Sequence, residues 1–326
     1  MTAGGRRSAV AAGSAAVAVS AGAYAHRRAR RPGWTPPRGR VVNTTALSVR
    51  VLGDTGPPIV LLHGLVASGV FWGGAYDRLA DHHRLVVPDL LGFGRSPRPA
   101  SGYGPDDHAE ALGACLDDLG VTEPVAIGAH SLGTLIGLRL AATNPERVAG
   151  VVAFGPPLYP DPGAALAHVS ATGPMGRLAV LPGGTAERVC RWVCDHRTIA
   201  GRLAALTHPG LPPAIAFDAV QHSWTSYSET LRLVILAAEA TTWLEQVRCP
   251  VHLVAGDRDP VVDHAHLRRI ADAGDNVELR QESGRHDYPL AHPEKCATMI
   301  AAAWGRGQPG GKVRRRPSTA GHQLMD

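Results

Sequence analysis

The chain has 326 residues, of which 44% are hydrophobic and 19% charged, so it can bury a substantial core in one large domain or two modest ones. Its net charge of +5 originates at its ends: residues 1–40 carry +8 and residues 306–326 carry +4, which leaves −7 on the part between them. A nucleic-acid-binding fold needs a basic surface on its folded part, so the acidic body excludes nucleic acid as a partner.

The N-terminal region has the layout of a targeting segment. Arg6-Arg7 precedes the uncharged residues 8–25, which end in Ala23-Tyr24-Ala25, and a second arginine cluster follows. This order is typical of an export signal or, if uncleaved, of a membrane anchor. Nine of these eighteen residues are alanine, however. As a helix, residues 8–25 would span about 27 Å, which is shorter than a ~30 Å hydrocarbon core. The alternative interpretation, that residues 1–40 are a basic, Ala-rich, disordered extension with no membrane role, therefore stays open. The cellular location is open as well.

Between the tails, short apolar runs alternate with helical patterns, which predicts an α/β fold with a mostly parallel sheet flanked by helices. Strands are predicted at 48–52, 59–62, 85–87, 125–127, 148–154, 251–255 and 277–281. Helices are predicted at 72–81, 105–119, 132–142, 263–273 and 293–304.

The alternation of strands and helices breaks between residues 156 and 240. No strong strand pattern occurs there, and helices are predicted at 186–199, 213–221 and 228–238. We expect residues 156–240 to form a helical cap inserted into an α/β core, because a linker rarely contains three amphipathic segments. That core comprises residues 41–155 and 241–304, and the Gly-, Pro- and Arg-rich residues 305–326 are expected to be a disordered tail.

The cysteines do not suggest a disulfide framework in a chain of this size. The five cysteines are Cys115, Cys190, Cys194, Cys249 and Cys296. Two of them, Cys190 and Cys194, lie four residues apart with His196 nearby, a spacing that a metal site could also show. We favour two small buried side chains on one helical face, and we predict no metal site.

The most informative motif is Ala129-His130-Ser131-Leu132-Gly133, which lies between a predicted strand and a predicted helix. A serine with small residues two positions away on both sides, at a strand-to-helix turn, is typical of a nucleophile elbow. The turn is sharp and strained, and small side chains avoid clashes there. The same pattern recurs at residues 18–22, but no strand precedes it and no turn follows. We therefore predict Ser131 as the nucleophile.

A serine hydroxyl needs a base to remove its proton and an acid to orient that base. The strand at 251–255 runs into a turn with Asp257 and Asp259, and the strand at 277–281 leads into a loop with His286. The carboxyl ends of parallel strands meet at one edge of a sheet, so these side chains are expected near Ser131. The chain order Ser, Asp, His distinguishes this arrangement from other serine-triad hydrolases.

Over residues 45–304 the chain resembles the α/β-hydrolase fold family in its capped, single-domain form. Two further segments match that family: Leu62-His63-Gly64-Leu65 after a strand, and residues 89–96, which are similar to its D-x-x-G-x-G-x-S loop. The resemblance implies Asp259 as the acid, since the family places it at the fourth residue of G-x-x-D. Asp257 is the alternative, as a turn residue.

The resemblance also implies His286, in a G-x-H context, as the base. Its rivals His63, His130 and His292 are better explained by loop packing or backbone orientation. The oxyanion hole is expected from two backbone N–H groups. One belongs to Leu132, directly after the nucleophile, and the other to Leu65, where the preceding glycine permits close approach. No metal or organic cofactor is required.

The resemblance implies a carboxylic-ester hydrolase that forms an acyl-enzyme on Ser131 and takes a small-molecule acyl ester. Epoxide hydrolases and haloalkane dehalogenases attack with aspartate, which serine cannot replace. An acyltransferase or thioesterase with the same triad stays open, as does a non-catalytic ligand-binding protein. A C–C bond hydrolase is also open, although such relatives usually have two glycines after the elbow, where this chain has Gly133-Thr134.

The expected cap would cover the site and set its specificity. Its candidate pocket-lining residues are Trp192, Phe217, Trp224 and Tyr227. Each of these aromatic side chains could equally belong to the core of the cap itself.

Overall fold

The computed structural model describes residues 34–180, 184–207 and 210–307. The segment at 8–25, for which a signal or anchor is an open interpretation, lies outside the described residues, as does most of the predicted C-terminal tail. Within the described ranges, no helix is both long and apolar enough to cross a membrane.

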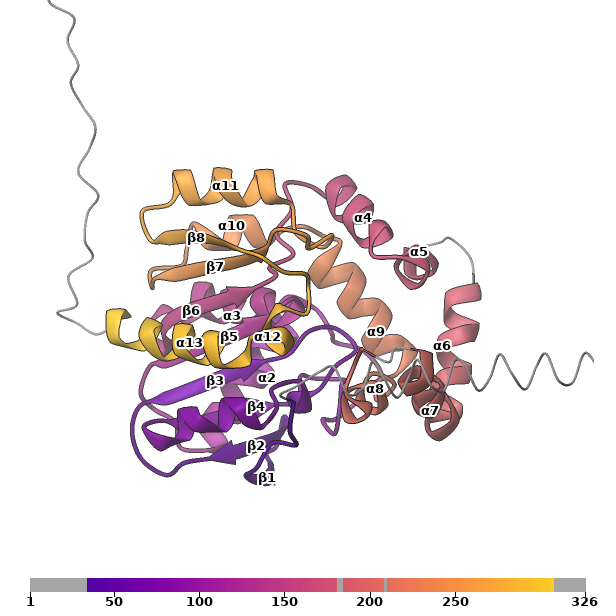
Figure 1. The fold of residues 1–326 in the computed structure, drawn as a ribbon, viewed down its shortest axis with the longest axis horizontal. Helices are drawn as coiled ribbons and strands as arrows, with labels where there is room; N and C mark the ends of the chain where they lie inside the picture. The colour runs from indigo at the N-terminus through magenta and orange to yellow at the C-terminus, as the bar shows by residue number, and fades with distance from the viewer. Residues whose placement is uncertain (1–33, 181–183, 208–209, 308–326) are drawn as a thin grey trace, which may run out of the picture.

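An eight-stranded sheet with the order β1-β2-β4-β3-β5-β6-β7-β8 forms the centre of the protein (Figure 1). The strands are β1 (Arg40–Asn43), β2 (Ser48–Leu52), β3 (Pro58–Leu62), β4 (Arg84–Pro88), β5 (Val125–His130), β6 (Val148–Phe154), β7 (Val251–Gly256) and β8 (Val277–Glu282). Strand β2 is antiparallel to both of its neighbours, and all other pairings are parallel. The predicted α/β fold with a mostly parallel sheet is therefore confirmed. Only β1 was not predicted, because this short edge strand is largely exposed and shows no buried apolar pattern.

Helices cover both faces of the sheet, because successive residues of its buried strands point to opposite sides. On one face, Val60 and Leu62 belong to a core shared with α2 (Pro105–Asp118), α3 (Leu132–Thr143) and α11 (His264–Ala273). On the other face, Ile59 and Leu61 pack with α13 (Pro293–Gly307), α12 (Tyr288–Ala291) and the 3₁₀ segments η1 (Gly69–Phe71) and η2 (Gly74–Asp81). The sheet is thus packed between two apolar cores, one on each face.

The helix predicted at 72–81 is present over Gly74–Asp81, but as the 3₁₀ helix η2 rather than an α-helix. The N–H of Gly74 donates to the carbonyl oxygen of Thr35, outside the segment. Its buried Asp77 accepts from the N–H of Arg38 and pairs with Arg50 of β2. These tertiary contacts override the helical pattern of the sequence.

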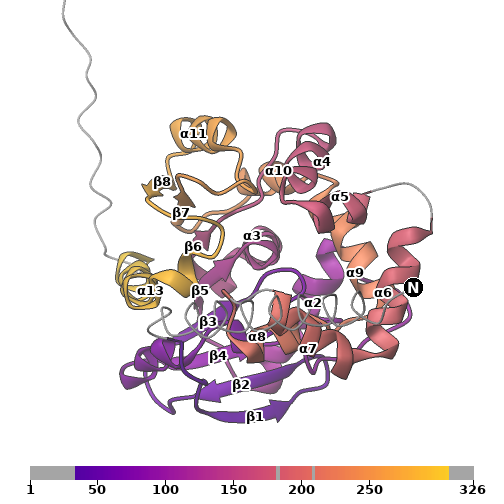
Figure 2. The ribbon, with the colours of Figure 1, turned by 45° about the vertical axis from the view of Figure 1, so that its right-hand side comes forward.

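Between β6 and β7 the described residues form helices and no strand. They are α4 (Pro162–Ala171), α5 (Pro174–Val180), α6 (Thr185–Asp195), α7 (Arg197–Thr207), α8 (Pro213–Asp218), α9 (Trp224–Thr230), the π-helical η4 (Leu231–Ile235) and α10 (Ala240–Leu244). Figures 1 and 2 both show α6 to α9 grouped together to the right of the sheet.

Two helix boundaries in this stretch differ from the sequence prediction. The single helix predicted at 186–199 breaks at His196, whose φ of −119° and ψ of 38° are not helical, and so becomes α6 and α7. The helix predicted at 228–238 begins earlier, at Trp224, because Ser223 caps it by accepting from the N–H of Ser226. The helices α4 and α5 were not predicted.

Replacing Arg50 with alanine is expected to lower the free energy of unfolding by about 3 kcal/mol, because the buried carboxylate of Asp77 then keeps only the exposed guanidinium of Arg38 at 3.6 Å. The Asp77 side chain is 1% exposed and lies 2.9 Å from the guanidinium of Arg50, which is 10% exposed. The matched control is Arg84→Ala on β4, which removes a pair to the half-exposed Glu123 and should cost less than about 1 kcal/mol. Urea denaturation measures the free energy of unfolding of both variants. Equal losses of this free energy in Arg50→Ala and Arg84→Ala would contradict the expectation.

Candidate active site

Ser131 lies in the sharp turn between β5 and α3. Its φ of 52° and ψ of −120° are unusual for a residue with a side chain, and its N–H donates to the carbonyl oxygen of Phe154 at 3.0 Å. A Cβ added at Gly133 would lie 2.6 Å from the carbonyl oxygen of Leu62 and 2.7 Å from that of His63. The turn therefore requires glycine at position 133, and it stores strain at Ser131.

Asp259 and His286 are joined by a hydrogen bond of 2.9 Å between Oδ2 and Nδ1. Asp259 follows β7 and is 3% exposed, and its Oδ1 accepts from the N–H of Val261 at 2.9 Å. Because a carboxylate accepts, Nδ1 of His286 carries the proton and Nε2 keeps a free lone pair. The His286 ring is thereby oriented to receive a proton at Nε2.

Asp257 makes a different contact, although it also follows β7. Its half-exposed carboxylate accepts from the N–H of Gly284 at 2.8 Å and lies 3.4 Å from Nε of Arg258. The hydrogen bond from Gly284 keeps the pKa of Asp257 below its usual range. Asp257 thus anchors the loop before His286, whereas Asp259 contacts the His286 ring.

Two adjacent residues at the end of β6 connect Ser131 with the Asp259–His286 pair. The carbonyl oxygen of Phe154 binds the N–H of Ser131, and Gly155 follows with a φ of +56°. A Cβ at Gly155 would lie 2.9 Å from both Oδ2 of Asp259 and Nδ1 of His286. Gly155 was not predicted as a site residue, although a glycine directly after an apolar strand at this edge is a usable signal in the sequence.

The backbone of Gly64, the residue directly before Leu65, passes beside Ser131. A Cβ at Gly64 would lie 3.2 Å from Cβ of Ser131 and 3.1 Å from Nδ1 of His130. On the other side, Leu132 is the first residue of α3, and an N–H group in the first turn of a helix has no intrahelical acceptor. Both segments that carry the expected oxyanion donors therefore adjoin Ser131.

His63 is completely buried and uses both ring nitrogens for backbone contacts. Nδ1 donates to the carbonyl oxygen of Gly64 at 2.8 Å, and Nε2 accepts from the N–H of Leu90 at 2.9 Å. Leu90 belongs to the segment 89–96, in which both carboxylate oxygens of Asp89 accept backbone N–H groups. His63 and the D-x-x-G-x-G-x-S segment therefore hold loops in place beside Ser131.

His130, next to the serine, also makes a structural contact. Its Nε2 donates to the carbonyl oxygen of His286 at 2.8 Å, and its ring stacks on Phe71 with centroids 4.5 Å apart. Burial, reinforced by the neighbouring His286, places the pKa of His130 well below its usual value, so this imidazole is neutral. His292 is exposed beside the ring of Tyr288. Of the four candidate histidines, only His286 contacts Asp259.

The four aromatic candidates for the pocket do not form one cluster in the structure. Trp192 is 47% exposed and stacks on His196. Phe217 of α8 packs against α7, where a Cβ at Gly201 would lie 2.7 Å from its ring. The rings of Trp224 and Tyr227 lie 6.1 Å apart, and Tyr227 also packs against the core.

The sequence of this chain is similar to proteins of a known family. A family model described as alpha/beta hydrolase fold matches residues 57–183. Lipase LipV of Mycobacterium tuberculosis is 30% identical over 272 residues, which cover 79% of this chain and 98% of that protein. A haloalkane dehalogenase of Mesorhizobium japonicum is 33% identical over 117 residues, which cover 36% of this chain and 38% of that protein.

The fold also matches solved structures. The crystal structure of E-2-(acetamidomethylene)succinate hydrolase superposes with a TM-score of 0.65 and 22% identity. The match covers 81% of this chain and 98% of that hydrolase. At this identity the likeness concerns the fold alone.

Proposed function

The chain belongs to the alpha/beta hydrolase fold family, and on that premise we propose that it is a serine hydrolase that cleaves carboxylic esters through an acyl-enzyme on Ser131. The observation that carries this proposal is the hydrogen bond from Nδ1 of His286 to the buried Asp259, at the sheet edge where Ser131 lies on a strained turn. Similarity to a lipase over nearly the whole of that relative supports ester substrates.

In the proposed reaction, Nε2 of His286 takes the proton of the Ser131 hydroxyl as Oγ attacks the ester carbonyl. The N–H groups of Leu65 and Leu132 stabilise the resulting oxyanion, each by a few kcal/mol. His286 then protonates the leaving alcohol and activates a water molecule that hydrolyses the acyl-enzyme. Asp259 keeps the proton of the imidazole on Nδ1 throughout and stabilises the imidazolium.

Dehalogenation is a weaker alternative for this site. The dehalogenase relative aligns with only about a third of this chain, and such enzymes attack with aspartate where this chain has Ser131. A serine at this position would form a stable ether with a haloalkane, which water does not readily cleave. An ester, by contrast, gives an acyl-serine that water can hydrolyse.

We further propose that residues 156–240 act as a cap over the site, on a core of residues 41–155 and 241–304. Polar contacts link this stretch to core loops: Asp218 accepts from the hydroxyl of Ser68, and the hydroxyl of Ser226 donates to the carbonyl oxygen of Gly92 at 3.0 Å. Trp224 and Tyr227 are the better pocket candidates, because Trp192 is half-exposed and stacked on its own helix.

Replacing Gly155 with alanine is expected to lower kcat about 100-fold, since a displacement of about 1 Å among catalytic groups can cost that much. The added methyl group would lie 2.9 Å from both Asp259 and His286. The matched control is Gly120→Ala, which introduces the same backbone strain at a φ of +66° but meets nothing within 4 Å. Esterase kinetics on both folded variants measure the difference. Equal kcat values for the two variants would show that the contact between Asp259 and His286 does not require glycine at position 155.

Labelling with a fluorophosphonate probe tests the proposed function directly. The full chain is labelled, digested and mapped, and the modification is expected on Ser131. Labelled enzyme should lose its activity towards p-nitrophenyl esters in proportion. A folded protein that takes no label, or that takes it on another serine without losing activity, would overturn the proposal.

A further inference from the structure

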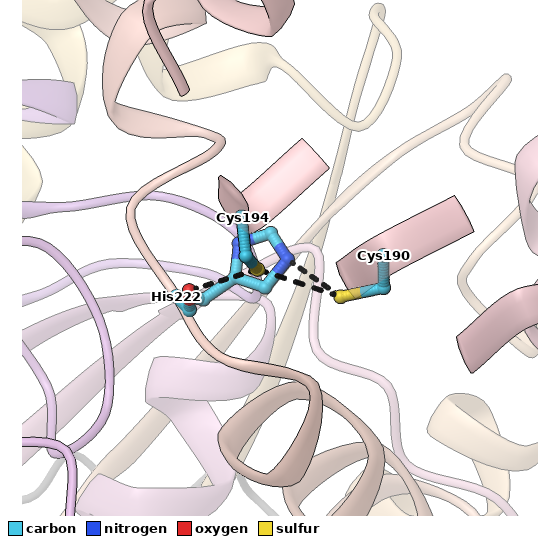
Figure 3. A group of neighbouring side chains, drawn as sticks. All are labelled: Cys190, Cys194 and His222. Atoms are coloured by element: carbon cyan, nitrogen blue, oxygen red, sulfur yellow. Dashed lines mark hydrogen bonds between the residues drawn. The ribbon is translucent and has the colours of Figure 1, made fainter. Parts of the chain in front are cut away.

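Two cysteines and a histidine meet in the helical stretch between β6 and β7 (Figure 3). Cys190 and Cys194 lie one turn apart on α6, and His222 lies in the segment just before α9. Sγ of Cys190 lies 3.9 Å from Sγ of Cys194 and 3.4 Å from Nε2 of His222. All three donor atoms lie within 4.8 Å of one another.

Two of the three separations match the ligand edges of a tetrahedral zinc site, while Sγ of Cys194 donates to the carbonyl oxygen of His222 at 3.2 Å. With Zn–S bonds of about 2.3 Å and Zn–N bonds of about 2.0–2.1 Å, tetrahedral angles place two sulfurs about 3.8 Å apart and a sulfur and a nitrogen about 3.5 Å apart. The observed 3.9 Å and 3.4 Å are close to these values. Small adjustments of side chains would therefore bring all three atoms to bonding distance from one ion.

We propose that Cys190, Cys194 and His222 bind one Zn²⁺ ion, with a water molecule as the fourth ligand. Two thiolates and one imidazole form a donor set that zinc prefers, and two thiolates neutralise its charge. The proposal departs from our sequence prediction of no metal, and it is independent of the esterase function. It adds a second site in the chain, remote in sequence from Ser131.

Zinc binds thiolates and a neutral imidazole, so the protonation of the three side chains bears on the pH at which an ion would bind. Burial chiefly lowers the pKa of His222 to about 4, so its imidazole is neutral near pH 7. The contact between the two thiols lowers the pKa of Cys194 to about 7, and the same contact, together with burial, raises the pKa of Cys190. Metal binding would therefore have to displace the proton of Cys190.

The partner histidine is not the one that the sequence indicated. His196 is two residues from Cys194, but its Nδ1 contacts the carbonyl oxygen of Trp192 at 2.9 Å and its ring stacks on the same tryptophan. His222 is 28 residues from Cys194 in the sequence and joins the cysteines only through the fold. The ion would therefore cross-link α6 to the start of α9.

The test is a zinc titration of the full chain. The protein is reduced with a phosphine, stripped with EDTA, exchanged into metal-free buffer and titrated with Zn²⁺ against a chromophoric chelator. One equivalent should bind to wild type. Cys194→Ser should weaken this binding at least about 100-fold, because even changes to residues behind metal ligands cost 10–100-fold in affinity. The matched controls His196→Gln and Cys249→Ser should bind as wild type does.

Two further readouts keep the proposal open to refutation if a cysteine variant folds poorly. Wild type loaded with Co²⁺ should show the thiolate charge-transfer and tetrahedral ligand-field absorption bands, and Zn²⁺ should raise its thermal midpoint. A stripped, folded wild type that binds no Zn²⁺ would overturn the proposal. Binding that Cys190→Ser and Cys194→Ser leave unchanged, or a cobalt spectrum without thiolate bands, would also overturn it.

Discussion

Replacing Ser131 with alanine is expected to lower kcat/KM for p-nitrophenyl esters by at least about 10⁴-fold, since losing the nucleophile of a serine triad costs up to about 10⁶-fold in kcat. The remaining groups could still bind the ester and polarise its carbonyl, so a small residual rate is expected. Only the hydroxyl is removed, and Ser131 is 8% exposed in a turn fixed by Gly133 and Phe154. The free energy of unfolding should therefore change little.

A matched control comes from the second copy of the motif. Ser20 stands in the same small-x-Ser-x-Gly pattern as Ser131, in the part of the chain outside the described residues. Ser20→Ala in the full chain should leave the kinetics unchanged. If folded Ser131→Ala retained wild-type kcat/KM, the acyl-enzyme proposal would be wrong, and a binding protein with adventitious turnover would become the better explanation.

Strands with a continuous apolar pattern were predictable to within a few residues. Strand β6 occurs at the predicted residues because it is buried on both faces and its pattern is unbroken. Elements held by distant contacts were not predictable. The segment at 74–81 forms a 3₁₀ helix around the buried Asp77, and α6 ends at Asp195, where no proline or glycine marks a break.

The same distinction between local patterns and distant contacts applies to the residues of the site. Ser131, Asp259 and His286 were predicted, because each follows or adjoins a predicted strand and motifs fix their order. Gly155 and His222 were missed as contact residues. Their contacts depend on which strands become neighbours and on how the helical stretch folds back, and neither is encoded in local sequence patterns.

Two residues outside the predicted triad, His130 and Asp257, give the site much of its rigidity. His130 fixes the backbone of His286 through its carbonyl oxygen, while Asp257 fixes the preceding loop through the N–H of Gly284. The two contacts approach the His286 loop from β5 and β7, so the imidazole is held by its backbone as well as by Asp259. Preorganisation of this kind lowers the reorganisation that the reaction requires.

Substitutions of the neighbouring residues Asp257 and Asp259 test which of the two carboxylates orients His286. Asp259→Asn is expected to lower kcat about 10⁴-fold, the effect known for a triad aspartate. The new amide can donate to Nδ1 of His286, which would place the imidazole proton on Nε2 and leave no base for Ser131. Asp257→Asn should leave kcat close to wild type, because the carbonyl oxygen of asparagine still accepts from the N–H of Gly284.

Both substitutions remove one negative charge and change the side-chain volume little, so they differ in position rather than in chemistry. Steady-state kinetics across a pH range separate them: Asp259→Asn should lose kcat at every pH, because the imidazole tautomer is wrong even when the ring is neutral. A ranking in which Asp257→Asn is the more damaging variant would transfer the role of the acid to Asp257. It would also mean that the 2.9 Å contact between Asp259 and His286 is structural.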